Sequence, residues 1–323
     1  IPADNNISLR ASTSQKKFIE LMETLGKDNP VAILIDEYDK PIIDYLEEEA
    51  IPKSLENRRI LKNFYSAVKD CDKYIQFLFI TGVSKFSKVS FFSDLNNLTD
   101  ITLSTKYSKI AGYTQSELKT NYNSYLKMLM KKFKIKREKL IETIKLWYNG
   151  YSWDGKNFLY NPYSLLNLFE NLSFDNFWFK SGTPTFLTDL IRKKSVDIEK
   201  YDRSFQVKSS ILDSYDLNNI DISLLLFQTG YLTIKGVLID KKDFSQTYQL
   251  AYPNKEVRDS FYDVLVVEFT GIIKTTFLEI VKELISNLED NDFDKFILYL
   301  KSIYAKIPSA IFIKDNEAYY HTV

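Results

Sequence analysis

The feature that most constrains this chain is a short apolar run that ends abruptly in two acids. Residues 31–35 read Val-Ala-Ile-Leu-Ile, follow Pro30 and lead directly into Asp36 and Glu37. A run of this length, rich in β-branched side chains, predicts a strand buried on both faces of a parallel sheet. The two carboxylates are then expected at the carboxyl end of that strand.

Carboxylates at this edge of a sheet have a chemical use. In an open α/β sheet, ligands bind at the carboxyl ends of the strands. In enzymes that cleave nucleoside triphosphates, the first of two adjacent acids steadies Mg²⁺ and the second polarises the attacking water. The alternative interpretation is a buried strand that merely stops at a polar turn, because an apolar run followed by Asp-Glu is common by chance.

A second apolar run strengthens the chemical interpretation. Residues 74–80 form this run, which is followed by Thr81 and Ser84, and residues 57–70 between the two runs have the apolar spacing of a helix. A strand, helix, strand unit with a right-handed crossover lays its strands in parallel. Thr81 and Ser84 are therefore expected at the same sheet edge as the two acids, where a polar side chain can sense a γ-phosphate.

Several long motifs make the chain resemble a known family. They include ILIDEYDKP at 33–41 and WYNGY at 147–151, with further matching segments at 63–66, 79–87, 92–102, 112–114, 160–162, 177–184, 226–233 and 252–257. Together these segments closely resemble the bacterial AAA-ATPase-like family, in which a P-loop ATPase-like domain usually precedes a PD-(D/E)XK nuclease-like domain. The resemblance covers nearly the whole chain.

The resemblance implies a fold, cofactors and roles for particular residues. The expected fold class is α/β, with a partial P-loop NTPase parallel sheet and its helices, followed by a mainly α-helical region that contains a winged-helix-like module. The implied cofactors are ATP and Mg²⁺. Asp36 would steady the metal and thereby the nucleotide, Glu37 would be the catalytic base, and Thr81 or Ser84 would sense the γ-phosphate.

The resemblance also implies that the chain is an internal piece of a longer protein. In the family, a phosphate-binding strand, the Walker A loop and a helix come before the point where this sequence starts, and a nuclease-like domain begins near its end. This piece alone is then expected to bind ATP weakly and to hydrolyse none. A gap in the sheet is expected between the strand of Thr81 and a short strand over 99–103.

One segment nearly spells a phosphate-binding loop. Residues 150–157 contain Gly150, Gly155 and Lys156 at the required spacing. We reject this interpretation because the segment follows a helix, Asn157 replaces the hydroxyl that binds Mg²⁺, and bulky aromatic residues occupy the loop. The two glycines are better explained as turn residues with positive φ.

Changes in composition predict four regions. Residues 1–112 form the partial AAA-ATPase-like α/β core, and residues 113–210, where amphipathic helices take over, form a helical lid region. Residues 211–270 show a helix, hairpin, helix order that suggests a winged-helix-like module. Residues 271–323 are expected to be a helical linker into the nuclease-like domain.

The composition limits the classes of partner. The 323 residues carry 43 basic and 43 acidic side chains, so the chain as a whole lacks the electrostatic footprint of a nucleic-acid-binding protein. Cys71 is the only cysteine, which excludes an internal disulfide. With no long apolar run, we expect a cytoplasmic protein without a membrane partner. The oligomeric state cannot be derived from the sequence.

Metal-dependent nuclease chemistry finds no support in these residues. A PD-(D/E)XK site needs an Asp and a Glu-x-Lys on neighbouring strands, and no Glu-x-Lys lies in a predicted strand. His321 is the only histidine, and an ordinary position near the first helix of a further domain explains it better than a metal site. Nucleic acid is therefore expected as a partner only through a nuclease-like domain.

Two functions from different classes remain. The first is an ATP-binding and hydrolysing AAA-like ATPase core that controls an attached PD-(D/E)XK nuclease-like effector. The second is a non-hydrolysing scaffold or DNA-binding module with a degenerate nucleotide site. The presence of both Asp36 and Glu37 favours the first.

Overall fold

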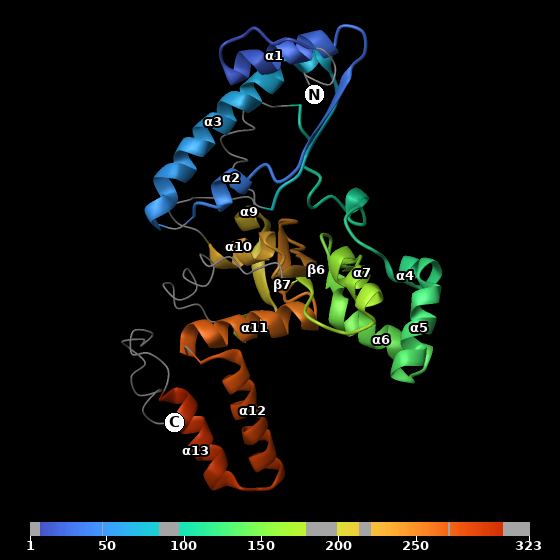
Figure 1. The fold of residues 1–323 in the computed structure, drawn as a ribbon, viewed down its shortest axis with the longest axis vertical. Helices are drawn as coiled ribbons and strands as arrows, with labels where there is room; N and C mark the ends of the chain where they lie inside the picture. The colour runs from blue at the N-terminus through green and yellow to red at the C-terminus, as the bar shows by residue number, and fades with distance from the viewer. Residues whose placement is uncertain are drawn as a thin grey trace. The chain divides into compact units, whose positions relative to one another are not determined.

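The computed structural model describes residues 7–46, 48–83, 97–178, 199–212, 221–270 and 272–305. The chain divides into two compact units (Figure 1). Unit 1 comprises Ile1–Ile101 and Ser209–Gly230, and unit 2 comprises Thr102–Lys208 and Tyr231–Val323. The candidate carboxylates lie in unit 1.

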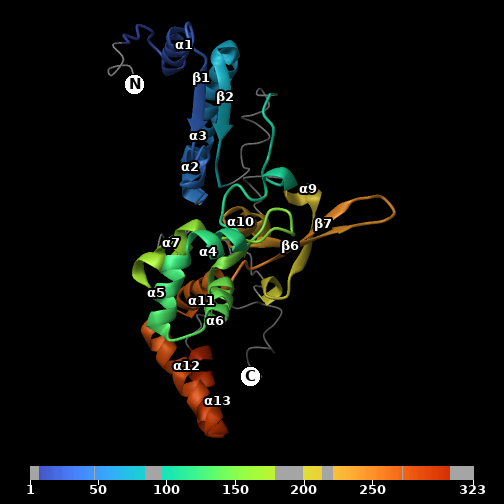
Figure 2. The same ribbon diagram turned by 90° about the vertical axis from the view of Figure 1, so that its right-hand side faces the viewer.

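Unit 1 is built around a strand, helix, strand arrangement. Its elements are α1 (Ser14–Leu25), β1 (Val31–Ile35), α2 (Lys40–Ile43), α3 (Ile51–Asp70), β2 (Ile75–Ile80), α9 (Ser209–Leu212) and α10 (Ile222–Gln228). Strands β1 and β2 pair in parallel, with Ile33 opposite Leu78 and Ile35 opposite Ile80, and they lie side by side in Figure 2. The predicted parallel pair is confirmed, and its crossover helix begins at Ile51 because Pro52 suits a first helical turn.

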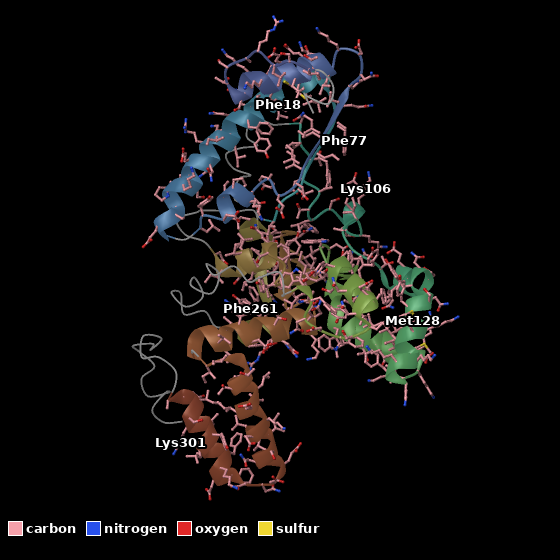
Figure 3. All side chains as sticks on the ribbon, viewed as in Figure 1. Phe18, Phe77, Lys106, Met128, Phe261 and Lys301 are labelled. Carbon is pink, nitrogen blue, oxygen red and sulfur yellow. The ribbon has the colours of Figure 1, made fainter. Side chains whose placement is uncertain are left out.

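The predicted burial of β1 on both faces is wrong for the described structure. Helices α1 and α3 lie on one side of the strand pair (Figure 1), and Phe18 of α1 contacts Phe64 of α3 with ring centroids 5.0 Å apart. On one sheet face, Leu34 is 72% exposed and Phe77, labelled in Figure 3, is 54% exposed. The described helices therefore cover one face of the β1–β2 pair, and the apolar residues of the other face stay exposed.

The predicted short strand over 99–103 is also wrong. Residues 98–101 have no regular structure, and residues 102 and 103 form a turn. Among the described residues, β1 and β2 make a two-stranded sheet. The expected gap was to lie between the strand of Thr81 and this second strand, so the structure does not test it. The placement of a further phosphate-binding unit stays a prediction.

The first part of unit 2 is a helical cluster. It contains α4 (Gln115–Asn121), α5 (Asn123–Phe133), α6 (Arg137–Tyr148), β3 (Asn149–Tyr151), β4 (Leu159–Tyr160) and α7 (Pro162–Asn171). The helices share a core that includes Leu126, Ile144 and Leu168, each fully buried. The sequence predicts one helix over 115–133, but Tyr122 leaves helical geometry and stacks on Phe169 with ring centroids 5.0 Å apart.

The second part of unit 2 combines a small sheet with long helices. Its elements are β5 (Phe205–Lys208), β6 (Thr233–Ile239), β7 (Gln246–Ala251), α11 (Lys255–Thr270), α12 (Lys274–Glu289) and α13 (Phe293–Tyr304). The expected β6–β7 hairpin and the following helix are confirmed, whereas β5 joins the sheet on the other edge of β7 and was not predicted. The winged-helix assignment stays a prediction. The sequence also predicts that Thr183 and Pro184 start a helix, and these residues lie outside the described ones.

Two further sequence expectations concern single features. The sequence favours a space-filling role for Cys71 over a chemical one, and Cys71 is buried. Among the helices that the structure describes, none combines the length and apolar character needed to cross a membrane.

A buried carboxyl group lies at the start of α11. Glu256 is fully buried, and its Oε1 accepts a hydrogen bond from the Trp178 backbone N–H at 2.8 Å. Burial raises the pKa of Glu256 from its ordinary value of 4.5 to about 7, although the hydrogen bond from the Trp178 backbone N–H opposes the shift. The folded protein therefore holds this proton more tightly than the unfolded chain does.

We predict that Glu256→Gln removes a pH dependence of stability. Because the folded pKa is raised, the stabilising effect of the proton is complete below about pH 4.5 and is lost as pH rises through about 7. At pH 8 the variant should be more stable than the parent by up to about 3 kcal/mol, and the difference should shrink toward pH 5. Denaturant unfolding at several pH values measures this, with Glu170→Gln on the exposed side of α7 as the control. A difference that does not vary with pH would contradict the assignment.

Candidate functional site

The structure brings Asp36 and Thr81 together at the carboxyl end of the β1–β2 pair. The parallel ladder continues past both strands, because the Thr81 N–H donates to Ile35 O at 2.8 Å and the Tyr38 N–H donates to Thr81 O at 3.0 Å. The Thr81 hydroxyl then donates a hydrogen bond to Asp36 Oδ1. The expectation that these two side chains share a sheet edge is confirmed.

Asp36 is oriented from two directions. Its Oδ1 also accepts the backbone N–H of Glu37 at 3.0 Å. Both donors bind the same carboxylate oxygen, and the residue is exposed. Neither of these two hydrogen bonds involves Oδ2. A cation can therefore approach Oδ2 without displacing either bond.

Glu37 has an unusual backbone conformation. Its φ is 50°, in the left-handed region that residues other than glycine enter at a cost of about 1 kcal/mol or more. Its side chain is 58% exposed and forms an ion pair with Lys40 at 3.5 Å. An exposed ion pair of this kind contributes little stability, so the Glu37 carboxylate is available for other contacts.

Asp39 is a residue that the sequence interpretation missed. It is fully buried, and its Oδ1 accepts the backbone N–H of Val83 at 3.1 Å. The sequence signal was an Asp directly before Lys-Pro, which is typical of a helix N-cap. Asp39 does occupy the N-cap of α2, but its side chain makes no capping hydrogen bond and turns to the loop after β2 instead.

Asp36 is the described residue that would hold a metal ion at this edge of the sheet. Ser84 lies outside the described residues. Within the described ranges, no group of three or more His, Cys, Asp or Glu side chains is arranged to hold a metal ion. Asp36 alone nevertheless fits Mg²⁺, which proteins bind through one or two carboxylates and which takes its remaining ligands from water and phosphates.

The glycine-lysine segment at 150–157 is a structural contact within unit 2. Asp154 accepts the backbone N–H groups of Lys156 at 2.9 Å and Asn157 at 2.8 Å. Although burial opposes it, these bonds hold the pKa of Asp154 well below its usual range. Ser152 N–H donates to Thr233 Oγ1 at 2.7 Å, which ties the segment to β6. Three backbone N–H groups of the segment, those of Ser152, Lys156 and Asn157, are thus engaged within the fold.

The comparisons with known proteins support the N-terminal assignment. Residues 3–92 match the AAA-ATPase-like family model, whose description is predicted AAA-ATPase. The chain is 35% identical over 301 residues to an uncharacterized protein in the vnfD 5' region of Azotobacter chroococcum mcd 1. That alignment covers 91% of this chain and 54% of the relative, so the chain spans about half the length of the curated relative it matches. No solved structure matches the chain.

At its N-terminus the chain is therefore similar to the AAA-ATPase-like family. The matched residues contain β1, β2 and the cluster formed by Asp36, Glu37 and Thr81. The relative carries no functional description, so a more specific activity has to be argued from the site itself.

We predict that Gly82→Ala disturbs the site by steric conflict. A Cβ at Gly82 would overlap the Tyr38 ring and lie 2.6 Å from Asp39 Oδ1. Because one of these neighbours is a fixed hydrogen-bond acceptor, we expect a loss of about 1–3 kcal/mol in stability. Val83→Ala, which keeps the backbone N–H and trims a side chain that is 45% exposed, should change stability by less than about 0.5 kcal/mol. Denaturant unfolding compares the two variants, and equal effects would contradict this account.

Proposed function

We propose that the chain is the ATP-binding and hydrolysing core of an AAA-like ATPase that controls an attached PD-(D/E)XK nuclease-like effector. The observation that carries the proposal is the hydrogen-bonded pair of Asp36 and Thr81 at the carboxyl end of two parallel strands, with exposed Glu37 next to it. This edge is where α/β sheets bind ligands. The greater length of the relative is compatible with an attached effector.

The roles of the three side chains follow from their environments. Asp36 is held by the Thr81 hydroxyl and the Glu37 N–H through one oxygen, which leaves the other to hold Mg²⁺. Mg²⁺ bound there supplies charge neutralisation to the phosphates. Glu37 accepts the proton of the attacking water, and its exposed carboxylate needs only to leave Lys40. Thr81 orients Asp36, and together with Ser84 it is proposed to respond to the γ-phosphate.

The test of this proposal is Glu37→Gln in the protein expressed at its natural length. If Glu37 is the base, the variant should bind Mg²⁺-ATP as the parent does. It should hydrolyse ATP more slowly than the parent by a factor of about one hundred or more. Glu56→Gln is a matched control, because Glu56 is 51% exposed and pairs with a lysine three residues away, as Glu37 does. Steady-state turnover and calorimetric titration measure both effects. Equal turnover in the Glu37 variant and the parent would remove Glu37 from the mechanism.

A second candidate function is a non-hydrolysing scaffold or DNA-binding module. The observation in its favour is the order of a β6–β7 hairpin followed by α11, which is typical of winged-helix-like proteins. Against it stands the charge balance of 43 basic and 43 acidic residues. The first function therefore has the better physical support.

We predict that this chain binds duplex DNA only weakly. Without a net positive charge, affinity should stay in the non-specific range of about 10⁻⁴ to 10⁻⁶ M and collapse as the salt concentration rises. Fluorescence anisotropy at two salt concentrations, with random and genomic duplexes, measures this. Sequence-specific binding below micromolar concentration would favour the DNA-binding module instead.

A further inference from the structure

The buried carboxylate of Asp39 joins parts of unit 1 that are far apart in the sequence. Its Oδ1 accepts the Val83 N–H across 44 positions of the chain. Its backbone carbonyl accepts the N–H groups of Ile42 at 2.9 Å and Ile43 at 3.0 Å, which starts α2. Asp39 therefore contacts the loop after β2 with its side chain and α2 with its backbone.

Tyr65 of helix α3 lies near enough to Asp39 to respond to its charge. Tyr65 is buried, and burial together with the nearby charge of Asp39 raises the pKa of Tyr65 to about 12. Gly82 packs so closely that a Cβ there would lie 2.6 Å from Asp39 Oδ1. The buried carboxylate thus lies near Tyr65 of the crossover helix and against the backbone of the loop after β2.

A role in helix capping does not explain the side chain. An N-cap Asp normally stabilises its helix through a bond from its carboxylate to the N2 or N3 backbone N–H, and Asp39 makes no such bond. A fully buried carboxylate is costly unless it is hydrogen-bonded. Its bond therefore supports a backbone N–H in the loop that follows Thr81, the residue that binds Asp36.

We propose that Asp39 is a positioning residue that fixes the Thr81, Gly82 and Val83 segment against Asp36 and Glu37, so that the two loops move as one body. Three contacts join the loops: Tyr38 N–H to Thr81 O, Thr81 hydroxyl to Asp36, and Val83 N–H to Asp39. Of these three, the bond from the Val83 N–H is the one that holds the chain after Gly82. This inference rests on the proposed function, because it assigns the fixed loops to phosphate binding.

The test compares Asp39→Asn and Asp39→Leu in the protein expressed at its natural length. A bond to a charged acceptor is worth about 1.5–3 kcal/mol and one to a neutral acceptor about 1 kcal/mol. We expect hydrogen exchange at the Val83 amide to rise about fivefold in the Asn variant and about tenfold to a hundredfold in the Leu variant. The kcat for ATP should fall in the same order, whereas KM should change less than about threefold. Asp44→Leu, an exposed acid five positions later, is the control.

Each outcome decides a separate question. Unchanged exchange at Val83 in both variants would overturn the inference, as would altered exchange with unaltered kcat. If the parent protein hydrolyses no ATP, the proposed function fails, and the inference is then judged by exchange alone: the Thr81 and Gly82 amides must lose protection together with Val83. A change confined to Val83 would overturn it. If Asp39→Leu does not fold, the graded change in Asp39→Asn decides on the same criteria.

Discussion

The parallel pairing of β1 and β2 is the interaction on which the candidate site depends. Because the ladder extends past the strand ends through Thr81 N–H to Ile35 O and Tyr38 N–H to Thr81 O, the residues after each strand are brought together by backbone bonds. Side-chain chemistry is then added to a frame that is already fixed. The crossover helix α3 is what makes the pairing parallel, since parallel strands need a long connection.

The same pairing leaves an apolar surface in unit 1. Parallel sheets are normally covered on both faces, and the sequence of β1 has the continuous apolar character of such a strand. The described helices cover one face, and Leu34 and Phe77 are largely exposed on the other. The apolar sequence of β1 suits a strand that is covered on both faces. In the described residues this second face is left exposed.

Local patterns predicted the elements well, and tertiary contacts account for what they missed. Helix spacing over 57–70 predicted most of α3, because an amphipathic face is determined by the local sequence alone. The break at Tyr122 depends on stacking against Phe169, the pairing of β5 depends on β7, and neither partner is adjacent in sequence. At the candidate site, the positions of Asp36 and Thr81 after their strands predicted that the two side chains lie at one sheet edge. Asp39 was missed because its partner, Val83, offers a backbone N–H that no sequence motif reveals.

Asp36 and Asp39 illustrate how position decides the use of identical side chains. Asp36 is exposed and binds a hydroxyl and an N–H through one oxygen, which suits a carboxylate that holds a cation. Asp39, three residues later, is fully buried and binds backbone, which suits a carboxylate that holds the chain. The turn that separates them passes through Glu37 at a φ of 50°. On one side of this residue Asp36 is exposed, and on the other Asp39 is buried near Tyr65 of α3. A single strained residue thus separates a group available for chemistry from the group that keeps the surrounding loops in place.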